Sequence, residues 1–122
     1  MMKIALVGHC GVDGPRIEAQ IHSIVDAADV CSCNDADALN RICDDGVDLL
    51  LFNRELGFGF DDWQGVDLMA ELRASHPNVK MMLISDRPDA QAAAREAGAL
   101  PGFGKADLGT SKVEKALRNA LA

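Results

Sequence analysis

The sequence predicts an α/β fold in which parallel strands form one doubly wound sheet of order 2-1-3-4-5. Strand-like and helix-like segments alternate five times along the chain, and such alternation favours right-handed crossovers between parallel strands. The strand-like runs are almost continuously apolar, as expected for strands covered on both faces. With 122 residues, the chain is long enough for one domain with a packed core, which we expect to span residues 1–122.

Composition narrows the classes of function. Hydrophobic residues make up 48% of the chain, which favours a packed globule. The net charge is −7 and no basic stripe is present, so we expect no direct nucleic-acid contact. No segment is apolar over a membrane-spanning length and no export signal is recognisable, which predicts a cytoplasmic protein without membrane contact. The four cysteines follow no disulfide pattern, so reduced thiols are expected.

Apolar periodicity and turn residues define the elements. The expected strands are residues 3–7, 29–33, 47–52, 79–84 and 101–103. Helices are expected to start at Gly14 and Pro15, after a cap at Asn34 or Asp35, near Gly65, at residue 90, and after a cap at Thr110 or Ser111. The helices are expected to end where Gly46, Pro77 and Gly98 interrupt the helical pattern.

Polar side chains follow several of these strands. In doubly wound sheets the carboxyl ends of the strands gather around one crevice, where sites are usually found. This rule brings together the residues at those ends, which are Gly8, His9, Asn53, Ser85 and Lys105.

The layout, and above all the segment 97–108, resembles the receiver domain of bacterial two-component response regulators, a CheY-like, flavodoxin-like (βα)5 fold. The resemblance implies that Asn53 stands where the family has its phosphoacceptor aspartate. Gly8 and His9 match the acidic pair that holds magnesium. Ser85 matches the hydroxyl residue that responds to phosphorylation, and Lys105 matches the lysine that contacts the phosphoryl group.

These substitutions predict a degenerate site. A carboxylate can attack phosphorus, whereas the amide of Asn53 is a poor nucleophile, and without the acidic pair magnesium has too few oxygen ligands. Lys105 also loses its usual acidic partner, unless Asp13 or Asp86 replaces it.

We therefore expect a stand-alone pseudo-receiver that is not an enzyme and uses no cofactor or metal. It would act as a regulatory interaction module for a signalling protein of unknown identity, and a homodimer is left open. An ordinary response regulator that uses another acid remains an alternative, with Glu55 or Asp86 as the acceptor.

A second alternative lies in the first turn. Cys10 is followed by five residues and then Arg16, which resembles the signature of cysteine-dependent phosphatases. In that family a thiolate attacks phosphorus, and loop amides with the arginine hold the oxyanions. Asp13 would repel phosphate in such a cradle, and Pro15 lacks an amide proton. A structural turn is therefore the favoured interpretation.

The loop after Asn53 is rich in aromatic residues, because it contains Phe58, Phe60 and Trp63. Loops that border a strand-end site commonly carry recognition residues. The three rings therefore form either a partner-docking patch or lid, or a cover that folds back over the sheet edge.

Overall fold

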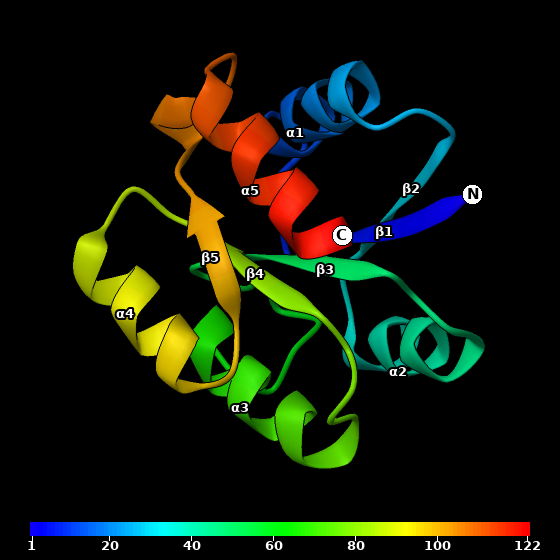
Figure 1. Ribbon diagram of the computed structural model, residues 1–122. Coiled ribbons are helices and arrows are strands. Elements are labelled where there is room, and N and C mark those ends of the chain that lie inside the picture. Colours follow the sequence, from blue (N-terminus) through cyan, green and yellow to red (C-terminus); the bar gives the residue numbers. More distant parts are fainter.

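The computed structural model describes residues 1–122 and confirms the predicted fold: a parallel sheet of order β2-β1-β3-β4-β5 (Figure 1). The strands are β1 (Met2–Val7), β2 (Ala28–Cys33), β3 (Leu49–Asn53), β4 (Met81–Ile84) and β5 (Leu100–Phe103). The helices are α1 (Asp13–Ile24), α2 (Ala36–Asp45), α3 (Gly65–Ser75), α4 (Pro88–Glu96) and α5 (Ser111–Leu121), with a 3₁₀ turn, η1, at Lys105–Asp107.

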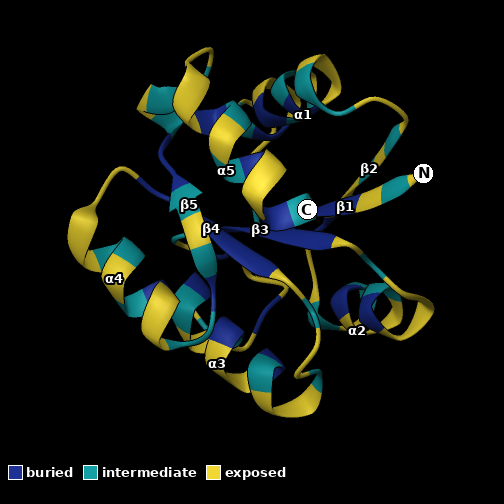
Figure 2. Cartoon of the chain, in the orientation of Figure 1, coloured by how far each residue is buried: buried dark blue, intermediate teal, exposed yellow.

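Alternate residues of the central strands supply two separate cores. On one face, Leu50 and Phe52 belong to a cluster that packs against α2, α3 and α4. On the other face, Leu49 and Leu51 pack against α1 and α5. All four side chains are completely buried, and Figures 1 and 2 show β3 in the middle of the sheet, between the two helical layers. This burial explains why the strand lacks the polar alternation of a half-exposed one.

Several element boundaries differ from the sequence-based expectation for local reasons. The first helix begins at Asp13, one residue early, and the fourth begins at Pro88, since proline suits a first helical turn. Asp35 caps α2 by accepting a 2.7 Å hydrogen bond from the Ala38 amide. The side-chain cap expected before α5 is wrong, because the Thr110 hydroxyl donates to the Asp107 carbonyl instead.

The loop between β3 and α3, residues 54–64, is an internally bonded flap. Glu55 and Gln64 form an antiparallel bridge at its base. At its far end, the Gly59 carbonyl accepts a 3.0 Å hydrogen bond from the Ala36 amide at the start of α2. A Cβ on Gly59 would lie 2.0 Å from the Asn34 carbonyl oxygen, so only glycine permits this approach. The flap is thus tied at both its base and its tip.

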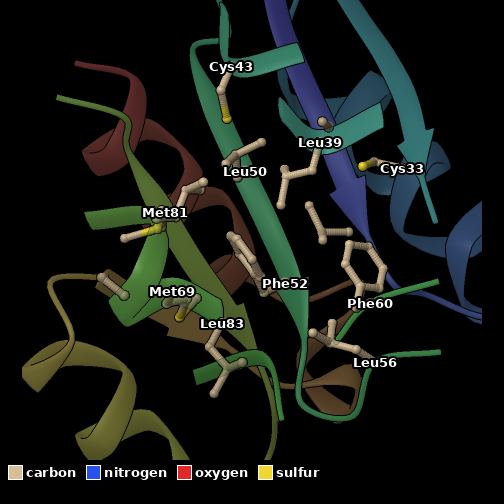
Figure 3. Packing of buried hydrophobic residues seen from close by; sticks show 14 of the residues in the cluster. Cys33, Leu39, Cys43, Leu50, Phe52, Leu56, Phe60, Met69, Met81 and Leu83 are labelled. Carbon is tan, nitrogen blue, oxygen red and sulfur yellow. The ribbon is translucent and has the colours of Figure 1, made fainter. Parts of the chain in front are cut away.

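The three aromatic residues of the flap separate into two environments. Phe60 is buried, with 8% of its surface exposed, and belongs to the same cluster as Leu56 and Phe52 (Figure 3). A docking role for Phe60 would require exposure, so that expectation is wrong. Phe58 and Trp63 are 98% and 56% exposed, and their rings meet edge to face with centroids 6.2 Å apart. One ring anchors the flap, and the other two face solvent.

This division predicts unequal losses of stability when the two phenylalanines are truncated. Phe60→Ala should lower the free energy of unfolding by about 3 kcal/mol or more, because it removes a buried aromatic side chain. Phe58→Ala should cost about 1 kcal/mol or less, since only the edge contact with Trp63 is lost. Denaturant unfolding of the two variants measures the difference. Equal losses would contradict the assignment of Phe60 as the anchor.

Candidate functional site

The carboxyl ends of β3, β4 and β5 border a polar cleft of about 370 Å³. The cleft brings together three predicted site residues, Asn53, Ser85 and Lys105. The other two, Gly8 and His9, lie on the far side of Asn53, in a neighbouring groove of about 480 Å³ beneath the aromatic flap. Asn53 lines both depressions and is the predicted site residue that they share.

The side-chain amide of Asn53 acts as a hydrogen-bond donor. Its Nδ2 donates to the Glu55 carbonyl at 2.8 Å and to the Gly8 carbonyl at 3.4 Å. These bonds join the end of β1 to the start of the flap. An ionised aspartate only accepts hydrogen bonds, so it would place a negative oxygen against two carbonyl oxygens. The amide is thus a structural tie in addition to being a poor nucleophile.

Gly8 is required by its backbone and its neighbour. Its φ is +75°, in the region that favours glycine, and a Cβ there would lie 2.7 Å from Leu56 Cδ2. Leu56 is a buried residue of the flap. A larger residue at position 8, including the acid that the receiver resemblance would place there, would strain the backbone and displace Leu56.

His9 is a largely buried, neutral residue rather than a free ligand. Its Nε2 lies 2.9 Å from the Leu51 carbonyl, so this nitrogen carries the proton and donates it. The other nitrogen, Nδ1, is buried without a hydrogen-bond partner. Burial lowers the pKa of His9 to about 4, against the opposing effect of the bond to Leu51.

Lys105 pairs with the first of the two acids considered for it. Its Nζ lies 2.7 Å from a carboxylate oxygen of Asp13, in the first turn of α1. This hydrogen bond is the main reason that the pKa of Asp13 lies below its ordinary value. Asp86, the other candidate, instead accepts hydrogen bonds from the Ala106 amide at 3.2 and 3.3 Å. The pair therefore connects the start of α1 with the end of β5.

Ser85 lines the cleft, and Gln91, a residue missed in the sequence, holds the end of β4 from a neighbouring depression. The Ser85 hydroxyl accepts a 3.2 Å hydrogen bond from the Arg87 amide, so it is already engaged in the turn after β4. Gln91 reaches back from α4 and donates to the carbonyls of Leu83 and Ser85 at 2.9 and 3.0 Å. A glutamine in an alanine-rich helix carries no pattern that would have revealed this contact.

The residues of the site do not fit the magnesium ion that the receiver resemblance implies. Gly8 has no side chain, and the protonated nitrogen of His9 is bonded to Leu51. Magnesium favours several oxygen ligands, usually with one or two carboxylates. The chain contains no group of three or more histidine, cysteine, aspartate or glutamate residues placed to hold a metal ion.

The other candidate nucleophiles, the carboxylates of Glu55 and Asp86 and the thiol of Cys10, also have partners within the protein. Glu55 pairs with Arg54 at 2.8 Å, and Asp86 holds the Ala106 amide as described. Cys10 is exposed, but its sulfur accepts a hydrogen bond from the Asp13 amide, and its carbonyl accepts one from Gly14. The Asp13 and Gly14 amides therefore donate hydrogen bonds within the turn and are not free to bind phosphate. The negative Asp13 carboxylate lies beside them and would repel a phosphate. The geometry therefore weighs against the phosphatase hypothesis.

Burial of neutral His9 predicts a pH dependence of stability. Below its ordinary pKa of 6.5, the imidazole is protonated in the unfolded chain, whereas the folded protein keeps it neutral down to about pH 4. The unfolded state therefore binds more protons in this window, and stability falls as pH decreases from about 6.5 to 4, by about 3 kcal/mol.

The variant His9→Gln, which does not titrate, should lose this component of the pH dependence. Urea unfolding at several pH values compares the two proteins, and a nuclear magnetic resonance titration of the His9 ring reports the pKa directly. Parallel stability profiles for both proteins would contradict the assignment.

Comparisons with known proteins identify the fold. No protein-family model matches the sequence, and no curated protein matches it. Solved structures do match. The signal receiver domain of a DNA-binding response regulator from Colwellia psychrerythraea is 13% identical, with a TM-score of 0.74 and coverage of 98% of this chain and 97% of that one.

Two further solved structures match the chain over most of its length. A LuxR-family DNA-binding response regulator from Staphylococcus aureus has a TM-score of 0.76 at 14% identity, with 100% of both chains covered. The signal receiver domain of an HD domain-containing protein from Pseudomonas fluorescens has a TM-score of 0.75 at 22% identity, over 98% of this chain and 86% of that one. None of the helices combines the length and the apolar character of a membrane-spanning segment.

The matched solved structures together show that the chain has the fold of the receiver domains of two-component response regulators.

Proposed function

We propose that this protein is a regulatory protein-interaction module of a two-component or phosphorelay signalling pathway, in which the receiver fold is kept and aspartyl phosphorylation is absent. The observation that carries the proposal is the use of the Asn53 amide as a donor to Gly8 and Glu55. The Asn53 amide is a poor nucleophile, and its nitrogen is engaged by two backbone carbonyls, so it is suited to a structural role rather than to accepting a phosphoryl group.

The rest of the site supports the same function. In an active receiver, the lysine after the last strand interacts with the phosphorylated acid, whereas here Lys105 forms its ion pair with Asp13. Gly8 is held by a positive φ and by Leu56, and His9 is bonded to the main chain. Each group that would transmit phosphorylation thus has a fixed structural partner. Regulation then depends on binding of a partner protein rather than on covalent modification.

The proposal predicts that the protein resists phosphorylation. Incubation with acetyl phosphate and magnesium should add no phosphoryl group, and beryllofluoride should form no complex, because no carboxylate stands at position 53 and no metal site fits. Intact-mass spectrometry and fluorine magnetic resonance test the two reagents. An acid-labile phosphate on Glu55 or Asp86 would overturn the proposal in favour of a response regulator with another acceptor.

Restoring the acid should not restore the chemistry. Asn53→Asp should remain unphosphorylated because Gly8 and His9 still offer no magnesium ligands. It should also lower the free energy of unfolding by about 1–3 kcal/mol, since two backbone carbonyls lose their donor. Asn53→Ala is the matched control that removes the donor without adding a charge. If the Asn53→Asp variant is as stable as the parent and is readily phosphorylated, the site is intact and the proposal fails.

A further inference from the structure

An exposed aromatic pair, Phe58 and Trp63, lies on the β3–α3 flap and has no role in the proposed silent site. Phe58 and Trp63 contact each other edge to face and are 98% and 56% exposed. Both line the groove of about 480 Å³ beneath the flap. Large aromatic side chains on a surface are favoured as anchors of protein interfaces, because they bury much area with little loss of rotamer freedom.

The backbone that carries the pair is held in place before any partner arrives. The flap is closed at its base by the Leu56 amide, which donates to the Trp63 carbonyl at 2.8 Å. Phe60, which lies between the two exposed rings in sequence, is inserted into the core, and Gly59 contacts the start of α2. Binding to a fixed surface avoids the entropic cost of ordering a loop. The flap therefore has the properties of a preformed docking surface rather than of a lid.

The surroundings of the pair are strongly acidic. Four carboxylates lie beside Trp63 in the chain and in the first turns of α3, and none of them forms an ion pair within the protein: Asp61, Asp62, Asp67 and Glu71. They are close enough together that a hydrogen bond with Asp62, followed by the charges of its neighbours, raises the pKa of Glu71.

The basic residues of the same segment do not form ion pairs with this cluster. The stretch from Asn53 to Ser75 contains two basic residues, Arg54 and Arg73. Arg54 pairs with Glu55, and the Arg73 guanidinium donates to the Pro77 and Gly98 carbonyls. The negative charge beside the aromatic pair is therefore available to a ligand of opposite charge.

We infer that Phe58, Trp63 and the adjoining carboxylates form a docking surface for a lysine- and arginine-rich segment of a partner protein. A cationic head group over an aromatic face is attracted by the ring quadrupole, and the carboxylates would pair with the neighbouring cations. A nucleic acid would be repelled by the cluster. A second copy of the chain would bring a net charge of −7 with it. The inference rests on the proposed function in treating the protein as an interaction module.

A short synthetic peptide of lysine, arginine and leucine tests the surface directly, with a glutamate and leucine peptide as the control. The basic peptide should shift the emission of Trp63, the only tryptophan, and the backbone resonances it perturbs should be confined to residues 55–71. Binding should weaken as salt increases, since screening reduces attraction between exposed charges. No response to the basic peptide, or an equal response to the acidic one, would overturn the inference.

Variants separate the aromatic and the acidic contributions. Phe58→Ala should weaken binding about tenfold if it is an anchor. The triple variant Asp61→Asn, Asp62→Asn, Glu71→Gln should bind about tenfold more weakly and with less salt dependence. The matched control changes the net charge equally at exposed acids elsewhere and should bind like the parent: Asp26→Asn, Asp29→Asn, Glu96→Gln. Equal weakening by both triples would mean that only net charge matters and would overturn the inference.

Two further readouts keep the alternatives apart. Sedimentation of the protein alone tests the second copy, and a dimer that Trp63→Ala dissociates would overturn the inference in favour of self-association. Intact mass after acetyl phosphate treatment of the same sample tests the proposed function separately. A protein that stays unmodified but ignores the basic peptide would disprove the docking surface alone, whereas a phosphorylated protein would disprove the silent site.

Discussion

Complete burial of β3 on both faces is the constraint on which the rest of this structure depends. Leu49 and Leu51 belong to one core, and Leu50 and Phe52 belong to the other. Since neither face can move without opening a packed cluster, the strand places Asn53 at a fixed position on the carboxyl edge of the sheet. There its amide reaches the carbonyls of both Gly8 and Glu55. The hydrophobic cores therefore determine the geometry of the polar site.

The polar edge is built from neutral and mutually paired groups. An active receiver site concentrates acids that need a metal ion and a lysine for balance, whereas here Lys105 is paired with Asp13. His9 is uncharged near neutral pH because burial lowers its pKa to about 4. These polar groups satisfy one another without a ligand, which is consistent with the silent site that we propose. Four acids without an ion-pair partner lie on the flap and α3, near the two exposed rings.

Sequence reasoning about the candidate site succeeded where strand ends were involved and failed where side chains had to be paired. The rule that parallel strands meet at their carboxyl ends brought Asn53, Ser85 and Lys105 into one cleft. The rule did not choose between Asp13 and Asp86 as the partner of Lys105, because both follow strand ends and the choice depends on a few ångströms. It also gave no sign of Gln91, whose contacts with the ends of β4 exist only when α4 packs against the sheet.

By itself, the sequence determined the strand order, the buried central strand and the neutral residue at position 53. The buried strand and the residue that ends it are encoded locally, in the length and period of an apolar run, whereas the strand order follows from the topology that repeated strand–helix alternation favours. Only the tertiary structure decided that Phe60 is buried while Phe58 and Trp63 are exposed, since three aromatics within one short loop share one composition and differ only in direction. The same holds for the donor role of Asn53. Its contact with Gly8 forms only after β1 and β3 pair, and no periodic pattern records a contact made across the sheet.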